Sequence, residues 1–194
     1  MFQHTSSFVT LTIAVLLFLS VEKSSAGFFF SSSDESDRVC PGSPALIHAK
    51  CKMMVTFQES CDVVKNEMVG RMEGKNGWVD PHNGGVYTLE SVKKEDGDGT
   101  SGYKVEGKRL TGDDLFTDKF AFLLLNSGDG CIAQACSESQ VHSVLDFSTN
   151  YCNLHCLYCN KEDHCPIVHS ELHYTETFEK CSQHVKSKCT PNDP

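Results

Sequence analysis

The first regular pattern in the chain is an alternation of apolar and polar residues between His48 and Phe57. A β-strand with one buried face places an apolar side chain at every second position. The alternating positions here are Ala49, Cys51, Met53, Val55 and Phe57. We therefore predict a half-buried strand over residues 48–57.

A helical pattern follows directly. Ser60 is a favourable N-cap, and the apolar residues after it are spaced three and four positions apart, which places them on one face of a helix. This apolar stripe consists of Cys61, Val64, Met68 and Met72. Gly74 follows as a stop signal. The sequence predicts a helix from Cys61 to about Glu73 whose stripe faces the core.

The middle of the chain holds four strand-like runs that are divided by turn-rich segments. The runs cover residues 86–93, 103–110, 118–125 and 131–136, and the segments between them are rich in Gly, Asp, Asn and Ser. Such separators are typical of antiparallel hairpins. We expect a meander of four strands, with one further strand within residues 166–178.

One strand, one helix and a strand meander resemble, in their order, the cystatin-like α+β proteins, in which an antiparallel sheet wraps around a helix. The resemblance implies one helix packed on an antiparallel sheet. It carries over no protease-binding residues, because Gln140-Val141-His142-Ser143-Val144 does not supply the Gln-x-Val-x-Gly hairpin of cystatins. The alternative is a small lipocalin-like β-barrel. Gly77-Trp78 precedes the strands as in that family, although the Gly-x-Trp signature is not met and about eight strands would be needed.

The start of the chain is typical of a secretory signal peptide over residues 1–26. Residues 8–21 form an apolar stretch that is too short to span a bilayer, and Ser24, Ser25 and Ala26 supply the small residues of a cleavage site. Residues 27–39, rich in serine and acidic residues, are predicted to be a flexible leader. We expect residues 40–194 to form a single disulfide-rich α+β domain that is secreted into the extracellular space.

All eleven cysteines follow the predicted signal peptide. Export would deliver them to an oxidising compartment, where thiols pair as disulfides. Because eleven cysteines cannot all pair within one chain, we predict five disulfides and one cysteine that is either free or linked to a second chain in a dimer. Our candidate for the odd cysteine is Cys156, which Cys152 and Cys159 bracket closely. The ten disulfide candidates are Cys40, Cys51, Cys61, Cys131, Cys136, Cys152, Cys159, Cys165, Cys181 and Cys189.

The spacing Cys152-x-x-x-Cys156-x-x-Cys159 resembles the cluster-binding loop of radical S-adenosylmethionine enzymes, in which three thiolates hold a [4Fe–4S] cluster. In those enzymes most of an α/β barrel follows the loop. Residues 160–194 are too few for such a barrel, and no repeated strand–helix alternation is found. An exported chain would also hold its cysteines under oxidising conditions. We interpret the spacing as coincidental and predict no iron.

Two other segments could in principle bind a metal ion. Cysteines and histidines are dense between His155 and His173, and both are zinc ligands, but cysteines of secreted proteins usually pair with each other. The segment that starts at Asp96 resembles the start of an EF-hand loop. Its sixth and twelfth positions, Ser101 and Gly107, are not the residues of an EF-hand. We expect a solvated hairpin loop there, and no metal site in the chain.

The sequence also offers a nucleophile and a base, because Ser137 and Ser139 precede His142 closely. No nucleophile elbow surrounds these residues, so we expect neither an enzyme nor a cofactor.

The formal net charge of the chain is −9 at neutral pH. Nucleic acids and anionic membranes are bound by clustered Lys and Arg, so we expect neither as a partner. We interpret the chain as a secreted, non-enzymatic binding or matrix protein that acts on an extracellular protein through its surface. The alternative is a carrier of a small apolar ligand, which predicts an enlarged pocket under Trp78, Tyr87, Phe120 and Phe122.

Overall fold

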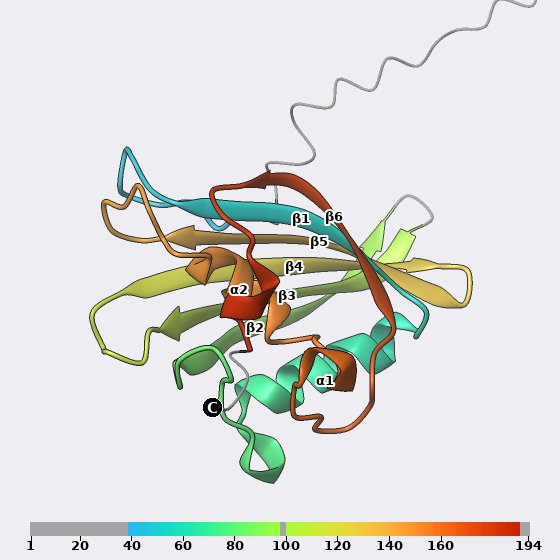
Figure 1. The fold of residues 1–194 in the computed structure, drawn as a ribbon. Helices are drawn as coiled ribbons and strands as arrows, with labels where there is room; N and C mark the ends of the chain where they lie inside the picture. The colour runs from blue at the N-terminus through green and yellow to red at the C-terminus, as the bar shows by residue number, and fades with distance from the viewer. Residues whose placement is uncertain (1–38, 98–99, 191–194) are drawn as a thin grey trace, which may run out of the picture. The chain divides into compact units, whose positions relative to one another are not determined.

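An antiparallel sheet carries both α-helices on one face (Figure 1). The computed structural model describes residues 39–97 and 100–190. The predicted signal peptide lies outside the described residues, and so does the predicted leader apart from Val39. All described residues belong to one of the two compact units of the chain, Ser32–Pro194. Within them, no helix combines the length and the apolar character that crossing a membrane requires.

The sheet contains six strands in the order β2-β3-β4-β5-β1-β6, and each neighbouring pair is antiparallel. The predicted first strand and the predicted meander of four strands are confirmed. The first strand pairs with β5, at the end of the meander, and β6 follows as an edge. The strands are β1 (Lys50–Phe57), β2 (Val86–Gly97), β3 (Thr100–Leu110), β4 (Thr117–Ser127), β5 (Gly130–Ser139) and β6 (Tyr174–Cys181).

The sheet does not close into a barrel. In the described part of the chain β2 and β6 are its two edges, and no pairing joins them. A barrel needs unbroken pairing around about eight strands, and this sheet has six. The lipocalin-like alternative is therefore wrong, and the chain forms a disulfide-rich α+β fold with an open sheet.

The first helix, α1 (Cys61–Met72), has the predicted bounds to within one residue and confirms the predicted apolar face. Its stripe of Cys61, Val64, Met68 and Met72 is buried in the core. Gly74 ends the helix in the left-handed region, at φ 62°, where glycine carries no steric penalty. The helix also buries Glu67 and Arg71, which the apolar pattern does not predict.

The expectation of a single helix is wrong. A second helix, α2 (Thr149–His155), packs against β1, β4 and β5. It has only seven residues, and two of its buried residues are Asn150 and Asn153, so no apolar stripe marks it in the sequence. Three single turns of 3₁₀-helix complete the described secondary structure: η2 (Lys75–Gly77), η3 (Lys161–Asp163) and η4 (Lys186–Lys188).

Aromatic rings fill the space between the sheet and the helices. The ring centroids of Trp78 and Tyr87 are 5.8 Å apart, those of Tyr87 and Phe120 5.7 Å, and those of Phe120 and Phe122 6.1 Å. Each pair is close to edge-to-face, the favourable arrangement of packed aromatic side chains. Phe120 and Phe122 are fully buried, whereas Trp78 and Tyr87 also line an open hollow of about 320 Å³ between the end of α1 and the loop before β2.

Candidate functional site

Polar side chains replace apolar ones on the inner face of the sheet at the side where β3 ends, β4 begins and β5 ends. Arg109 pairs with Asp118 across β3 and β4, and Asp118 pairs with Ser139 across β4 and β5. Directly paired residues of antiparallel strands present their side chains on the same face. All three residues are buried. They form a polar row across three strands.

The charge of Arg109 is neutralised by Asp80, in the loop before β2. Oδ2 of Asp80 accepts hydrogen bonds from Nε of Arg109, at 3.2 Å, and from Nη2. The backbone N–H of Gly85 donates to the same oxygen at 3.0 Å. A Cβ atom at Gly85 would collide with the guanidinium, so glycine lets this loop lie against Arg109.

Two asparagines of α2 donate hydrogen bonds to side chains of the polar row. Nδ2 of Asn153 donates to Oδ2 of Asp118 at 2.8 Å and to Oγ of Ser137 at 3.0 Å. Nδ2 of Asn150 donates to Oγ of Ser139 and to Oδ2 of Asp146, both at 3.0 Å. The short second helix is therefore attached to the sheet largely by amide side chains.

Three atoms of this cluster have no hydrogen-bond partner: Oδ1 of Asp118, Nη1 of Arg109 and Oδ1 of Asn153. Seven buried side-chain atoms of this kind occur among residues 39–97 and 100–190, so the cluster holds almost half of them. An unsatisfied buried polar atom costs about 1–3 kcal/mol of stability. Because native proteins retain few such atoms, their concentration at one place calls for an explanation.

The pKa of Asp118 is raised above its ordinary value. Burial is the largest cause, since it disfavours the charged carboxylate, and the hydrogen bond from Asn153, the neighbouring Ser139 hydroxyl and the charge of Arg109 oppose it only in part. Displaced pKa values of this kind are concentrated at functional sites, although structural networks produce them as well.

A cavity of about 150 Å³ lies against this row, between the β3–β4 turn and the β5–α2 loop. The two loops project from the same end of the sheet, on the left in Figure 1. An engineered cavity of this volume holds one benzene molecule. The polar lining residues are Thr111, Asp118, Ser139, Ser143, Asp146 and Thr149, and the apolar ones are Phe116, Leu145 and Phe147.

Exposed apolar side chains are concentrated on the two loops that line the cavity. Of the thirteen large apolar side chains that are exposed in the described part of the chain, six come from the two loops that form the cavity. Leu145 is 65% exposed and Phe147 72% exposed. We call this set the apolar rim; it consists of Leu115, Phe116, Val141, Val144, Leu145 and Phe147.

The backbone of the rim is strained. Phe147 and Ser148 adopt φ values of 50° and 74° in succession, and Asp114 on the opposite loop has φ 60°. The left-handed region is unfavourable for residues other than glycine, most of all for a bulky side chain such as Phe147. Strain of this kind persists where the surrounding structure enforces it and is frequent at binding sites.

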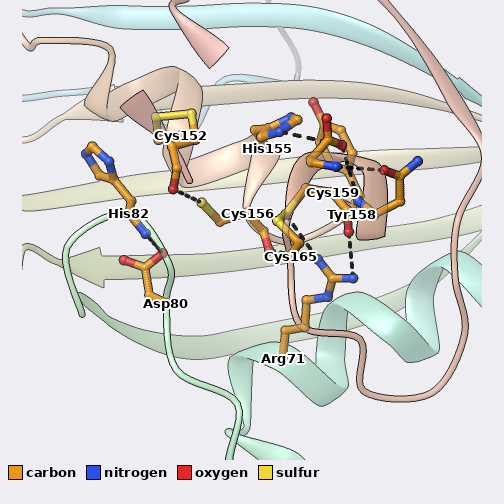
Figure 2. Close-up of a disulfide and its surroundings, with 12 residues drawn as sticks. Arg71, Asp80, His82, Cys152, His155, Cys156, Tyr158, Cys159 and Cys165 are labelled. Atoms are coloured by element: carbon orange, nitrogen blue, oxygen red, sulfur yellow. Dashed lines mark hydrogen bonds and ion pairs between the residues drawn. A yellow bond between two sulfur atoms is a disulfide. The ribbon is translucent and has the colours of Figure 1, made fainter. Parts of the chain in front are cut away.

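The cysteines form five disulfides: Cys40–Cys136, Cys51–Cys181, Cys61–Cys131, Cys152–Cys189 and Cys159–Cys165. Cys156 is a free, fully buried thiol. Figure 2 shows it between Cys152 and Arg71, and its Sγ donates to the backbone carbonyl of Cys189 at 3.7 Å. Burial and the neighbouring charge of Asp80 raise the pKa of the Cys156 thiol, which makes it a poor nucleophile.

A second buried ion pair, Glu67–Arg71 on α1, is fully satisfied. Nε of Arg71 donates to Oε1 of Glu67 at 2.8 Å, and its two Nη atoms donate to the carbonyls of Cys156 and Cys159 (Figure 2). The Glu67 carboxylate also accepts three backbone N–H groups, from residues 168, 169 and 170. Burial raises the pKa of Glu67, but these hydrogen bonds and the Arg71 charge outweigh it, so that the pKa is lowered.

The residues that the sequence offered for zinc do not assemble into a site. Cys159 and Cys165 are joined to each other, and Nδ1 of His155 lies 2.9 Å from Oε1 of Glu176 (Figure 2 shows His155, Cys159 and Cys165). Within the described ranges, the one potential metal-binding group is Cys40, Cys136 and Glu138, and its two sulfur atoms already form a disulfide. A disulfide supplies no thiolate to a metal ion.

The two serines and the histidine that the sequence offers as nucleophile and base lie in different surroundings. Oγ of Ser137 donates to Oδ1 of Asn150 at 2.8 Å, and Oγ of Ser139, in the buried polar row, accepts from Nδ2 of the same asparagine. His142 is exposed on the β5–α2 loop. The EF-hand-like segment is part of the β2–β3 hairpin, and residues 98 and 99 lie outside the described ranges.

The apolar pattern of the sequence does not by itself predict the polar row, but the alternation in β4 marks one of its members. Phe120, Phe122 and Leu124 are inward positions of β4, and the same period places Asp118 inward. A buried charge at the end of an apolar alternation marks such a site.

Comparison of the chain with protein-family models, curated proteins and solved structures finds no match in any of the three.

Proposed function

We propose that the chain is an extracellular, non-enzymatic binding protein that acts through the apolar rim and the cavity inside it. The observation that carries the proposal is the concentration of six exposed apolar side chains on the two loops that line a cavity with a buried polar floor, with the backbone of one loop strained at Phe147. Exposed apolar patches with polar surroundings are characteristic of interaction sites, and loops on a rigid sheet are a common place for them.

The disulfides support the extracellular part of the proposal. Five disulfides in a single domain are typical of proteins that live in an oxidising compartment, and each stabilises a fold by about 2–4 kcal/mol. A fold held in this way keeps the two loops in place even though their backbone is strained. The resemblance to cystatins in element order contributes no function, because it brings no inhibitory hairpin.

A carrier of a small apolar ligand is the second candidate. The cavity of about 150 Å³ favours it, but this volume suits one group of the size of benzene. The rim extends beyond the cavity through Leu115, Val141 and Val144, which such a ligand would leave exposed. We therefore prefer a protein partner.

The proposal is tested by capture of partners from the extracellular fluid of the source tissue. Immobilised wild-type protein is compared with Leu145→Asp and Phe147→Asp, which place a charge in the rim; aspartate also tolerates the left-handed backbone of residue 147. Val92→Asp is the matched control, because Val92 is exposed on β2, away from the rim. We expect one protein to be captured by the wild type and by Val92→Asp and lost from both rim variants. Equal capture by all four proteins would refute the proposed surface.

A further inference from the structure

We propose that the cavity receives a basic side chain, lysine or arginine, from the partner protein; this inference rests on the proposed function. The aliphatic stem of the side chain would lie against Phe116 and Leu145, and its charge would meet Asp118 and Asp146. Long basic side chains have this division between an apolar stem and a charged end. Side chains that fill such pockets at the centre of an interface contribute most of the binding energy.

The charges around the cavity favour a cation. Two of its lining residues are aspartates, and no Lys or Arg belongs to the lining. The nearest buried cation, Arg109, already forms an ion pair with Asp80. Among the described residues neither carboxylate forms an ion pair, although the charge of Arg109 acts on Asp118 from the neighbouring strand. Hydrogen bonds from an ionised donor to a carboxylate are about twice as strong as neutral ones.

The unpaired oxygen of Asp118 identifies the contact point. Asp118 is only 1% exposed, its Oδ2 accepts from Asn153, and its Oδ1 has no hydrogen-bond partner. Both oxygens of Asp146 are already engaged: Oδ1 accepts from the N–H of Ser148, and Oδ2 from Asn150. Asp118 is thus the acceptor that remains available, and Asp146 contributes its charge.

The size of the rim favours a protein as the source of the cation. A free amine would fill the cavity but leave Leu115, Val141 and Val144 in water. A protein surface covers these side chains and excludes water from the ion pair, which strengthens it.

The test uses small probes that reproduce the ends of side chains. Butylammonium and propylguanidinium stand for lysine and arginine, 1-pentanol for a neutral group of the same length and valerate for an anion. Each is titrated into the full-length secreted protein, and binding is followed by chemical-shift changes of the amides of the two loops. We expect both cations to bind at the loops about tenfold or more tightly than pentanol, and Asp118→Asn to abolish this preference. Asp129→Asn, a change of an exposed carboxylate on the β4–β5 turn, should leave the preference intact.

The inference would be overturned if pentanol or valerate bound as tightly as the cations. It would also be overturned if neither cation bound. The proposed function fails separately. If the rim variants lose the captured partner but Asp118→Asn retains it at wild-type affinity, the surface is correct and the basic side chain is wrong. If the rim variants retain the partner, the proposed function is wrong, and the probe titration alone decides what the cavity binds.

Discussion

Two clusters of buried charged residues in the described part of the chain differ in how completely their polar atoms are hydrogen-bonded. In the cluster on α1, each nitrogen of the Arg71 guanidinium and both oxygens of Glu67 have hydrogen-bond partners. In the cluster on the sheet, Arg109 and Asp118 each keep one atom without a partner, and a cavity adjoins Asp118. All polar side-chain atoms of the Glu67–Arg71 pair are hydrogen-bonded within the fold, whereas the sheet cluster has polar atoms that are not.

This difference separates a structural role from a binding role better than burial does. Glu67 and Asp118 are almost equally inaccessible. Their pKa values move in opposite directions, because the hydrogen bonds and the Arg71 charge at Glu67 outweigh the effect of burial, whereas the deeper burial of Asp118 outweighs its few favourable contacts. A buried carboxyl group whose ionised form is poorly stabilised by its own protein is available to a cation from outside.

The largest effect is expected from Glu67→Gln. A glutamine has one acceptor oxygen where the carboxylate has two, so at least one of the backbone N–H groups of residues 168–170 loses its partner, and Arg71 loses its counter-charge. Breaking a buried ion pair from one side costs about 3–5 kcal/mol. We expect the free energy of unfolding in urea to fall by this amount.

Glu73→Gln is the matched control for this change. Glu73 follows the same helix and forms an exposed ion pair with Lys75, at 2.7 Å. Exposed pairs contribute about 0–1 kcal/mol, so this variant should unfold nearly as the wild type does. A loss of less than 1 kcal/mol in Glu67→Gln as well would show that the α1 cluster is not the structural element that its hydrogen bonds indicate.

Asp118→Asn, unlike Glu67→Gln, should not lower the free energy of unfolding. Asparagine keeps the shape of the side chain and an oxygen for Asn153, and it removes a carboxylate whose charge is disfavoured by burial. We expect the free energy of unfolding to stay unchanged or to rise, by up to about 2 kcal/mol, while cation binding is lost. Urea unfolding beside the control Asp129→Asn measures the effect. A strong destabilisation would place Asp118 with Glu67, as a structural residue.

The stability difference between Asp118→Asn and the wild type should depend on pH. The pKa of Asp118 is higher in the folded chain than the ordinary value of 3.8, so the folded state takes up the proton first as the pH falls. The cost of the buried charge is present above the folded pKa and disappears below it. The advantage of Asp118→Asn over the wild type should therefore shrink as the pH falls from neutral toward 3.8.

The groups near Asp118 that carry charge act on this titration in opposite directions. Arg109 lowers the pKa of Asp118 and Asp146 raises it, and neither is changed by the substitution. Unfolding at a series of pH values gives the difference between the variant and the wild type directly. A difference that grows toward acid pH would contradict the raised pKa.

The sequence predicts those helices and strands in which every inward-facing position is buried. The alternation in β1 and the stripe of α1 follow from the burial of every second residue in one and of every third or fourth in the other. The edge strand β6 has mostly exposed side chains and therefore no alternation, so its start cannot be located from the pattern. Residues 95–97 were expected in a loop because they are acidic and glycine-rich, yet backbone pairing with β3 makes them part of β2.

The candidate site is harder to predict, because it depends on register and on contacts between distant segments. The row of Arg109, Asp118 and Ser139 exists only when three strands are aligned in one way. The pairs of the ten bonded cysteines are equally a product of the fold, since spacing alone leaves many pairings open. What the sequence does offer is the position of Asp118 at an inward site of an apolar alternation, a signal for a site but not for its ligand.

The smallest effect concerns Cys156, which is bonded to the α1 cluster and lies within the electrostatic influence of the sheet cluster. Its carbonyl accepts from Nη1 of Arg71 at 3.0 Å, and its thiol is influenced by the charges of Asp80 and Arg109. Because the thiol is fully buried and its pKa is raised, we expect iodoacetamide to alkylate the native protein only very slowly, and we expect no disulfide-linked dimer. In urea without reductant, mass spectrometry should find one alkylated cysteine per chain, at Cys156.

The rate of this alkylation in native buffer distinguishes the two clusters once more. A thiol of this kind reacts only when the structure around it opens, so its rate reports the population of open states. Glu67→Gln weakens the contact that holds the Cys156 carbonyl and should accelerate the reaction. Asp118→Asn leaves that contact in place and should react as slowly as the wild type. Equal acceleration in both variants would mean that the two clusters support the fold in the same way, and the distinction between them would fail.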